Sequence, residues 1–207
     1  MVDLTRVYLY RMTHIENIPH ILLNGITHMH SPNRNPNYVP IGDGSLISNR
    51  DKFKLSNGQQ LGSYIPFYFG TRMPMLFVIQ KGFNNVKRVP VEDIIYCVST
   101  IQEILDHKLD FIFSNGHAVD ELTEFYSADH VNDILDKIDM SAIGAKYWTS
   151  ETDLDLKRRK EAECLIHNDL PINSILGYVV YNALTKQKLI DIGIEEKKIV
   201  VRSNFYF

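Results

Sequence analysis

The stretch Tyr64-Ile-Pro-Phe-Tyr-Phe-Gly-Thr-Arg-Met-Pro-Met75 is unusually dense in aromatic residues, methionine and proline. Its first six residues predict a β-strand, and Pro66 predicts an edge strand or a bulge, because proline cannot donate a ladder hydrogen bond. Side chains alternate along a strand, so Tyr68 should point away from its core-forming phenylalanine neighbours, where it could stack on a ring-shaped ligand. A helix is expected to follow over residues 74–79, with a proline near its start.

Strand and helix signals continue on both sides of this stretch without the βαβ alternation of a doubly wound sheet, so the sequence predicts an α+β fold. Runs rich in β-branched and aromatic residues predict strands at 7–12, 94–98, 111–113, 163–167, 176–181 and 198–202. Apolar spacing predicts helices at 101–107, 130–148 and 183–191, and a charged helix or turn at 155–162. A further helix is expected with Thr13 as its N-cap, Glu16 completing a capping box and Gly25 at its end.

The composition is that of an ordinary globular protein of 207 residues, 44% hydrophobic and 23% charged. This length fits a single domain spanning residues 1–207. No stretch approaches the roughly 18 continuous apolar residues of a membrane span, and the N-terminus lacks a signal peptide's apolar run. Cys97 and Cys164 make neither a disulfide framework nor a metal-ligand spacing, so we expect a cytoplasmic protein without metal or membrane association. The glycines form no Rossmann or P-loop fingerprint.

The net charge of −3 argues against a protein that coats nucleic acid, but the charges are unevenly distributed along the chain. Residues 1–90 carry ten basic and four acidic side chains, whereas residues 91–207 carry twelve basic and twenty-one acidic ones. Folding can mix this asymmetry back over the surface. The alternative is that the basic part of the chain forms a face for an anionic ligand.

Residues 27–61 are rich in proline, glycine and asparagine without a clear period, which predicts a long loop of the kind that is usually functional or disordered. Arg50, near the end of this loop, is either solvated or clamps a diphosphate or carboxylate. Thr13, His14 and Asn17 stand at a strand-to-helix junction. Such a junction suits phosphate recognition, unless it is a simple helix cap with an exposed histidine.

The run Lys157-Arg-Arg-Lys-Glu-Ala-Glu163 allows two interpretations. If a helix continues through it, Arg159 and Glu163 form an ordinary surface ion pair. If Glu163 instead opens the following strand, its carboxylate is fixed beneath a mobile loop, where it can stabilise a developing cation. The turn Asn115-Gly-His-Ala118 offers an imidazole that is either merely exposed or orients a reacting group.

Taken in order, these motifs resemble one family. They are Tyr10-Arg-Met-Thr-His-Ile-Glu-Asn-Ile-Pro-His-Ile-Leu22, then Arg50, the stretch from Tyr64 to Met75, Gly116-His-Ala118, Ala145-Lys-Tyr-Trp148 and the run ending at Glu163. The combination is similar to the DarT family of DNA ADP-ribosyltransferase toxins, which are encoded beside a DarG-type antitoxin. The resemblance extends from about Tyr8 to the C-terminal residues.

The resemblance implies an ADP-ribosyltransferase-like fold, a split mixed β core with surrounding helices that clasps NAD+ in a cleft. It implies transfer of ADP-ribose to thymidine bases of single-stranded DNA, with release of nicotinamide and a block to replication. NAD+ is then the co-substrate, single-stranded DNA and a DarG-type macrodomain antitoxin are the partners, and we expect a monomer. The loop near 27–61 matches the NAD-binding and substrate loop, and residues 145–158 match the target-recognition loop.

By position in the motifs, Glu163 matches the family's catalytic glutamate, Arg50 its essential arginine and His117 the histidine of its Gly-His-Ala motif. Cofactor contacts are expected from Thr13, His14, Asn17, Tyr68 and Arg50, and DNA contacts from Met75, Arg72, Tyr147, Trp148, Lys157 and Arg158. Two departures from the family pattern, Asn115 in place of aspartate and Cys164 in place of phenylalanine or tyrosine, bear on substrate preference.

Other functions remain open from the sequence. A sister group of the family modifies guanine, and the same chemistry can act on RNA or protein. A non-catalytic nucleotide-binding module is a further alternative, although the presence of both Arg50 and Glu163 speaks against it.

Overall fold

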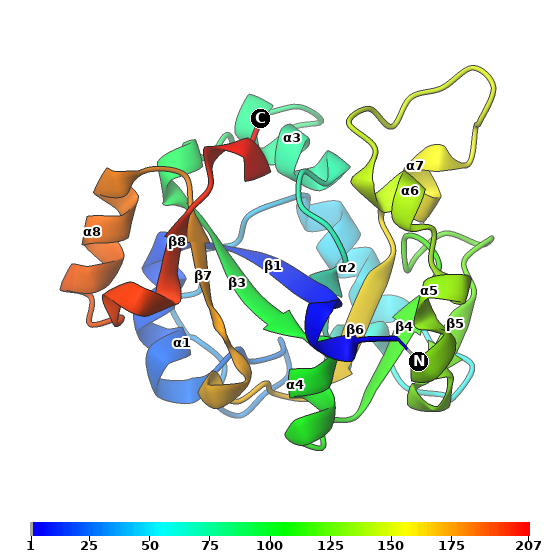
Figure 1. Ribbon diagram of the computed structural model, residues 1–207, viewed down its shortest axis with the longest axis horizontal. Helices are drawn as coiled ribbons and strands as arrows, with labels where there is room; N and C mark the ends of the chain where they lie inside the picture. Colours follow the sequence, from blue (N-terminus) through cyan, green and yellow to red (C-terminus); the bar gives the residue numbers. More distant parts are fainter. Residues whose placement is uncertain (1) are drawn as a thin grey trace.

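The computed structural model describes residues 2–207, and within them eight strands form one mixed sheet (Figure 1). The strand order is β5-β4-β6-β2-β1-β3-β7-β8, and every neighbouring pair is antiparallel except β7 and β8. The strands are β1 (Tyr8–His14), β2 (Tyr64–Tyr68), β3 (Ile94–Thr100), β4 (Phe111–Ser114), β5 (Phe125–Ser127), β6 (Glu163–His167), β7 (Gly177–Val180) and β8 (Ile199–Val201). The predicted α+β class is confirmed.

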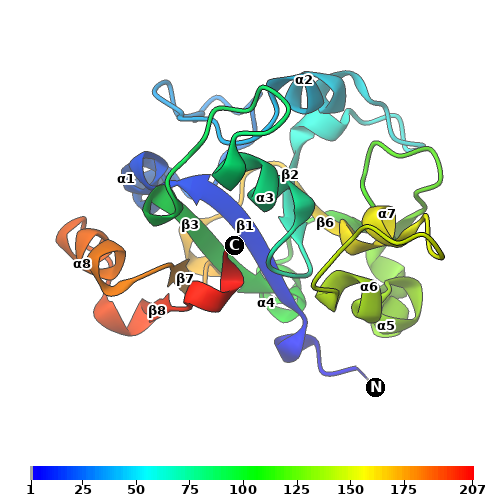
Figure 2. The ribbon, with the colours of Figure 1, turned by 90° about the horizontal axis from the view of Figure 1, so that it is seen from above.

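Short helices surround this sheet. They are α1 (Ile18–Asn24), α2 (Gly44–Lys52), α3 (Pro74–Lys81), α4 (Ile101–Asp106), α5 (Ile134–Lys137), α6 (Met140–Gly144), α7 (Leu156–Lys160) and α8 (Ala183–Asp191). In both ribbon views α1 and α8 lie toward the end of the sheet formed by β7 and β8, whereas α5, α6 and α7 lie at the opposite end (Figures 1 and 2). None of the helices in residues 2–207 has the length and apolar character needed to cross a membrane.

The sheet is split between its two central strands. Strand β1 pairs with β3 along its whole length but with β2 only at Tyr10 and Tyr68. Beyond that point the strands diverge, and Arg11 Nη1 reaches across to donate a hydrogen bond of 3.0 Å to the carbonyl oxygen of Pro66. The split leaves the side of β2 that faces β1 mostly without ladder partners, and it divides the sheet into β5-β4-β6-β2 and β1-β3-β7-β8.

This split explains Pro66, for which the prediction of an edge strand or bulge was wrong. Strand β2 is central, between β6 and β1. Within a strand the N–H and C=O of one residue point to the same side, and the Pro66 carbonyl points toward Arg11. The missing N–H of Pro66 therefore faces the split, where no ladder partner exists, and costs no sheet hydrogen bond.

Both faces of the sheet are covered by core side chains. Ile95 and Cys97 of β3 belong to the main core cluster, and Tyr96 and Val98 face a second cluster that includes residues of α3 and the C-terminal tail. Every residue of β3 is consequently buried. Such a strand has an apolar run instead of alternation, which is why its position could be predicted from composition.

The junction after β1 differs from the prediction. His14, not Thr13, caps the first helical turn: its Nδ1 accepts a hydrogen bond of 3.2 Å from the Glu16 N–H. The strand continues through His14, and the helical segment starts as a 3₁₀ turn before α1. The end was predicted correctly, since Gly25 has φ +74° and donates its N–H to Ile21.

The segment predicted as one long loop, residues 27–61, contains helix α2. Its N-cap is Asp43, whose carboxylate accepts a hydrogen bond of 2.8 Å from the Ser45 N–H. None of the residues of α2 is fully buried, so its sequence carries no apolar period that could have revealed it. Arg50 therefore lies on a helix.

The helix predicted over residues 130–148 is broken into a 3₁₀ segment, α5 and α6. Ile138 takes an extended conformation, and the Asp139 carboxylate starts α6 by accepting the Ala142 N–H at 2.9 Å. Val131 and Ile134 are buried as their spacing predicted, whereas Leu135 is exposed. The apolar spacing thus identified part of the buried face but not the aspartate that interrupts the helix.

Candidate active site

Glu163 opens strand β6, so the alternative of a helical surface ion pair with Arg159 is excluded. Helix α7 ends at Lys160, and Glu163 pairs with Tyr68 across the β2–β6 ladder. The Glu163 side chain is 0% exposed, and its Oε1 accepts a hydrogen bond of 3.0 Å from the Ala118 N–H. The backbone N–H of Glu163 donates to Ser114 Oγ at 3.1 Å, so both the main chain and the carboxylate are fixed.

Arg50 of α2 meets this carboxylate from a position 113 residues away in the sequence. Its Nη1 lies 3.1 Å from Glu163 Oε1 and 2.9 Å from Oε2. The other terminal nitrogen, Nη2, is buried and has no hydrogen-bond partner within residues 2–207. A buried guanidinium donor without an acceptor is suited to an incoming anionic group.

His117 lies beside this pair in the turn after β4. Its backbone N–H donates to the Arg158 carbonyl at 3.0 Å, and its own carbonyl accepts from Thr123 Oγ1. Burial lowers the pKa of the imidazole, although the nearby Glu163 carboxylate opposes this shift. The lowered pKa favours the uncharged imidazole, which can accept a proton within the site.

Arg50 and His117 line a cleft of about 810 Å³, a volume in the range of cofactor and nucleotide sites, and the buried Glu163 carboxylate is paired with the cleft residue Arg50. The half-buried Tyr68 lines it from the end of β2, and burial together with the Glu163 charge raises the pKa of its phenol. Elements from the first 80 residues supply most of the wall, including Arg11, Met12, His28, Arg34, Asn35, Tyr38, Leu46, Ile47, Arg50, Tyr64, Pro66, Met75 and Ile79. Arg11 and Arg34 of the basic part of the chain thus lie in the cleft wall, where the resemblance to the family places them.

Glu161 is a second acidic group that the sequence reasoning missed. It is only 7% exposed, and burial raises the pKa of its carboxyl to about 7, with the nearby Glu163 charge adding to the shift. It precedes Glu163 by two residues, and the charges of both groups act on Tyr68. The Glu-Ala-Glu spacing at a predicted strand start was the signal that could have identified it.

Three residues predicted to contact the cofactor are not among those that line the cleft: Thr13, His14 and Asn17. Asn17 is instead buried, and its carboxamide donates to the Val39 carbonyl at 2.8 Å and accepts from the Val39 N–H at 2.8 Å. Thr13 Oγ1 accepts a further hydrogen bond from the same carboxamide. Asn17 thus fixes the loop that forms one wall of the cleft.

Some of the residues predicted to contact DNA are accessible to a ligand, whereas others contact the protein itself. Met75 lines the cleft, while Tyr147 and Lys157 are exposed, and Trp148 packs against Phe77 of α3. Arg158 is committed to the protein itself, with Nε 2.7 Å from Asp155 Oδ1 and Nη1 donating to the Asn115 side chain at 2.9 Å.

Arg72 has an unusual position. Its backbone lies in the left-handed region, with φ +55°, and its guanidinium is stacked 4.5 Å from the ring centre of Phe207. Its Nε is buried without a hydrogen-bond partner among the described residues. Within residues 2–207 this cation has no carboxylate partner, and it lies near the C-terminal tail and Lys160.

Residues 2–207 contain no cluster of three or more His, Cys, Asp or Glu side chains arranged to hold a metal ion. The two cysteines are both buried and far from a thiolate state, because burial raises the pKa of each thiol. The polar side chains that line the cleft include the guanidiniums of Arg11, Arg34 and Arg50, the imidazoles of His28 and His117 and the phenol of Tyr68, and the Glu163 carboxylate is paired with Arg50.

Comparison with known proteins gives a consistent result. The family model described as "ssDNA thymidine ADP-ribosyltransferase, DarT" matches residues 10–207. A DNA ADP-ribosyl transferase of Escherichia coli O127:H6 is 32% identical over 187 residues, 89% of this chain and 84% of that protein. A DNA ADP-ribosyl transferase of Thermus sp. (strain 2.9) is 29% identical over 208 residues, 96% of this chain and 95% of that protein.

Solved structures agree. Thermus sp. 2.9 DarT in complex with ADP-ribosylated single-stranded DNA has a TM-score of 0.84 at 26% identity, over 97% of this chain and 96% of that one. The same protein in complex with NAD+ has a TM-score of 0.80 at 26% identity, over 100% and 99% of the two chains. The chain belongs to the DarT family of single-stranded DNA thymidine ADP-ribosyltransferases.

Proposed function

We propose that this protein transfers ADP-ribose from NAD+ to thymidine bases of single-stranded DNA and releases nicotinamide, so that modified templates block replication. The observation that carries the proposal is the pair formed by the buried Glu163 and by Arg50, which lines a cleft of about 810 Å³. Family membership adds the substrate class, since the matching family acts on thymidine in single-stranded DNA. The whole of residues 1–207 acts as one transferase domain in this proposal.

The cleft residues fit NAD+ as the co-substrate. Arg50 Nη2 is a buried donor that has no acceptor among the described residues, and Arg11 and Arg34 bring further positive charge to the wall, which suits a diphosphate. Tyr68 and Tyr38 offer aromatic faces for stacking on rings. The predicted contacts of Thr13, His14 and Asn17 with NAD+ then become indirect, because Asn17 holds the Val39 segment of the cleft wall.

Cleavage of the bond between ribose and nicotinamide builds positive charge on the ribose carbon. The Glu163 carboxylate is fixed by the Ala118 N–H and shielded from water, so its interaction with that charge is little screened. Nicotinamide leaves with the electron pair of the broken bond, the new bond joins the ribose carbon to N3 of thymine, and the N3 proton passes to solvent or to the His117 imidazole. Arg50 either holds the diphosphate or favours loss of that proton through its charge.

The target strand lies against the residues near α3 and the 145–158 segment in this proposal. Arg72, which has no carboxylate partner in the part of the chain that the structure describes, supplies a cation for a backbone phosphate. Tyr147 is exposed for base stacking, and Met75 lines the cleft next to the reacting base. A single strand is required because the reacting base edge is paired in a duplex. Lys157 is an additional exposed cation in this segment.

We also propose a DarG-type glycohydrolase as the physiological partner. A relative from Thermosipho africanus, 26% identical over 159 residues, is a fusion of a DNA ADP-ribosyl transferase with a DNA ADP-ribosyl glycohydrolase. Because the substrates are NAD+ and DNA, the cytoplasm is the expected compartment. The protein acts as a monomer in this proposal.

The test is incubation of the protein with NAD+ and a panel of single-stranded oligonucleotides that vary the bases around one thymidine. Mass spectrometry should show the addition of one ADP-ribose per modified thymidine, and the Glu163→Gln variant should lose transfer by about 10³-fold or more. Modification of guanine-only oligonucleotides would assign the protein to the guanine-modifying alternative. Full activity of Glu163→Gln would contradict the assigned catalytic residue.

A further inference from the structure

The segment between α6 and α7, residues 145–155, is called the target loop here. It stands out from the body of the molecule beyond these two helices (Figure 1). Near its start, Trp148 is docked on aromatic rings, with ring centres 5.5 Å from Phe77 and 5.6 Å from Phe207. Trp148 is also the single tryptophan of the chain, so its environment can be observed without interference from another indole.

The start of the target loop is held by Lys160. This side chain is 1% exposed, and its Nζ donates hydrogen bonds of 2.8 Å to the Ile143 carbonyl and 2.7 Å to the Ala145 carbonyl. Burial lowers the pKa of the ammonium group, and the Arg72 charge adds to this effect. A buried ammonium group is unfavourable unless its hydrogen bonds are satisfied, so these two carbonyl oxygens have to stay in place around Nζ. The contacts therefore fix the backbone where the loop leaves α6.

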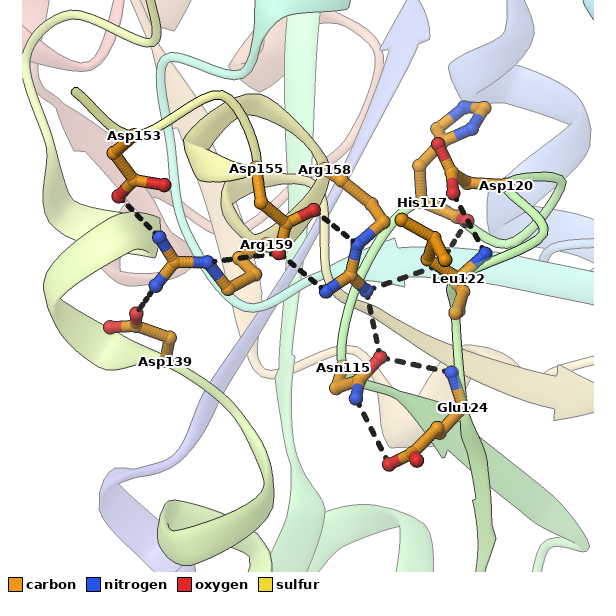
Figure 3. A network of polar contacts seen from close by, with 11 residues as sticks. Asn115, His117, Asp120, Leu122, Glu124, Asp139, Asp153, Asp155, Arg158 and Arg159 are labelled. Atoms are coloured by element: carbon orange, nitrogen blue, oxygen red, sulfur yellow. Dashed lines mark hydrogen bonds and ion pairs between the residues drawn. The ribbon is translucent and has the colours of Figure 1, made fainter. Parts of the chain in front are cut away.

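The end of the target loop is held by Arg159, the residue before Lys160. Its guanidinium contacts the carboxylates of Asp139, Asp153 and Asp155, the last with Nε 3.2 Å from Oδ2 (Figure 3). Asp139 is the N-cap of α6, whereas Asp153 and Asp155 belong to the loop. One side chain therefore connects the helix before the loop to the residues that end it.

Both anchors lie at the end of α7, and Glu163 follows Lys160 by three residues. The contacts at both ends of the loop therefore fix its position relative to the backbone that begins β6 at Glu163. Arg158 strengthens this connection on the other side, because it links Asp155 to Asn115 in the turn that carries His117. The exposed part of the loop, with Lys146 and Tyr147, projects from a fixed base.

We infer that Arg159 and Lys160 are positioning residues that fix the target loop relative to Glu163 and thereby determine how tightly and in which sequence context the DNA strand is presented. This inference rests on the proposed function for its DNA readout. Neither residue lines the cleft, so the binding of NAD+ does not depend directly on them.

The test compares Arg159→Gln and Lys160→Met with Lys186→Gln. The control removes the cation of Lys186, whose Nζ lies 2.9 Å from Glu196 Oε1. Lys186 belongs to α8, at the other end of the sheet. Loosening the loop should raise the KM for the oligonucleotide by about tenfold or more, because small displacements of substrate-positioning groups are that costly. The KM for NAD+ should stay within about twofold of the wild-type value, and the preference among flanking bases should weaken.

Trp148 fluorescence gives a readout that does not depend on catalysis. In Arg159→Gln and Lys160→Met, emission should shift to the red and quenching by acrylamide should increase, whereas Lys186→Gln should match the wild type. If wild-type protein modifies no oligonucleotide, the proposed function fails, and the fluorescence shift still decides whether these residues hold the loop. An unchanged fluorescence, or an equal rise of both KM values, would overturn the inference.

A milder variant keeps the test decisive if Arg159→Gln fails to fold. Asp153→Asn removes one of the three carboxylates from the loop side and leaves Asp139 and Asp155 in place. It should reproduce the fluorescence shift and the rise in oligonucleotide KM with smaller amplitude. Wild-type values of both in Asp153→Asn would count against the proposed anchoring.

Discussion

At the scale of single residues, the active site depends on a charged pair that is mostly removed from water. The Glu163 side chain is 0% exposed and that of Arg50 is 16% exposed, so deleting one partner leaves the other charge poorly compensated. Glu163→Gln should disturb the fold less than Glu163→Ala, since the glutamine amide oxygen can still accept a hydrogen bond from the Ala118 N–H. Loss of activity in Glu163→Gln is then easier to separate from loss of folding.

Glu161 should make the stability of the protein dependent on pH. Its carboxyl has a folded-state pKa of about 7, above the ordinary value of 4.5, so the stabilising contribution of the protonated form is complete below pH 4.5 and is lost as the pH rises through 7. Glu161→Gln should therefore be more stable than the wild type above pH 7, by up to about 3 kcal/mol, and similar to it at the acid end.

Urea unfolding at several pH values measures this difference. Glu151→Gln, a substitution at an exposed position, is the matched control and should follow the wild type throughout. A Glu161→Gln curve that runs parallel to the wild type across the whole range would show that the carboxyl is not protonated on folding.

At the scale of secondary-structure elements, a few glycines and capping residues determine where helices end and the chain turns. Gly25 ends α1 with φ +74°, and a Cβ at this position would lie 2.1 Å from the Leu170 carbonyl oxygen. The next residue, Ile26, forms an isolated bridge with Leu170. The close approach of these two segments ties the end of α1 to the chain after β6.

Gly25→Ala should therefore destabilise the protein by more than the usual penalty of about 1 kcal/mol for alanine at positive φ. Gly58→Ala separates the two causes, since Gly58 has φ +83° with nothing within 4 Å of its Cβ position. The difference between their unfolding free energies, measured by urea denaturation, isolates the clash with Leu170. Equal losses in the two variants would show that the segment after β6 yields without cost.

At the scale of the whole molecule, the charge distribution acquires a structural meaning. The basic part of the sequence, residues 1–90, supplies Arg11, Arg34 and Arg50 to the cleft, and Arg72 precedes the cleft residue Met75 by three positions. In the acidic part, the carboxylates of Asp139, Asp153 and Asp155 form ion pairs with Arg158 or Arg159 at the base of the target loop. A net charge of −3 is compatible with brief contact to a few phosphates and opposes indiscriminate DNA binding.

Binding of the oligonucleotide should therefore depend only weakly on salt. Each phosphate contact to a single strand contributes about 0.7 to the slope of log KM against log salt concentration, and Arg72→Gln should lower that slope by about this amount. Steady-state kinetics at several salt concentrations measure it, with the exposed Lys87→Gln as a control that keeps the slope. A wild-type slope in Arg72→Gln would remove Arg72 from the DNA path.

Much of the fold could be predicted from local patterns. The strands at β2, β3, β4 and β6, the helices α3 and α8, and the end of α1 at Gly25 all follow from apolar runs, prolines and glycines. Helix α2 could not be predicted, because it has no fully buried residue and hence no period. The interruption at Asp139 was hidden by continuous apolar spacing across two helices.

The sequence by itself determined the α+β class and most of the residues that could carry the chemistry, since these depend on neighbours in the chain, but it left open whether Glu163 continues a helix or opens a strand. Only the tertiary structure decided that Arg50 meets Glu163 across 113 residues, that β1 and β2 separate beyond Tyr10, and that Arg158, Arg159 and Lys160 bind protein groups. The physical reason is that a charge reveals its type in the sequence, whereas its partner is chosen by the fold that brings the two together.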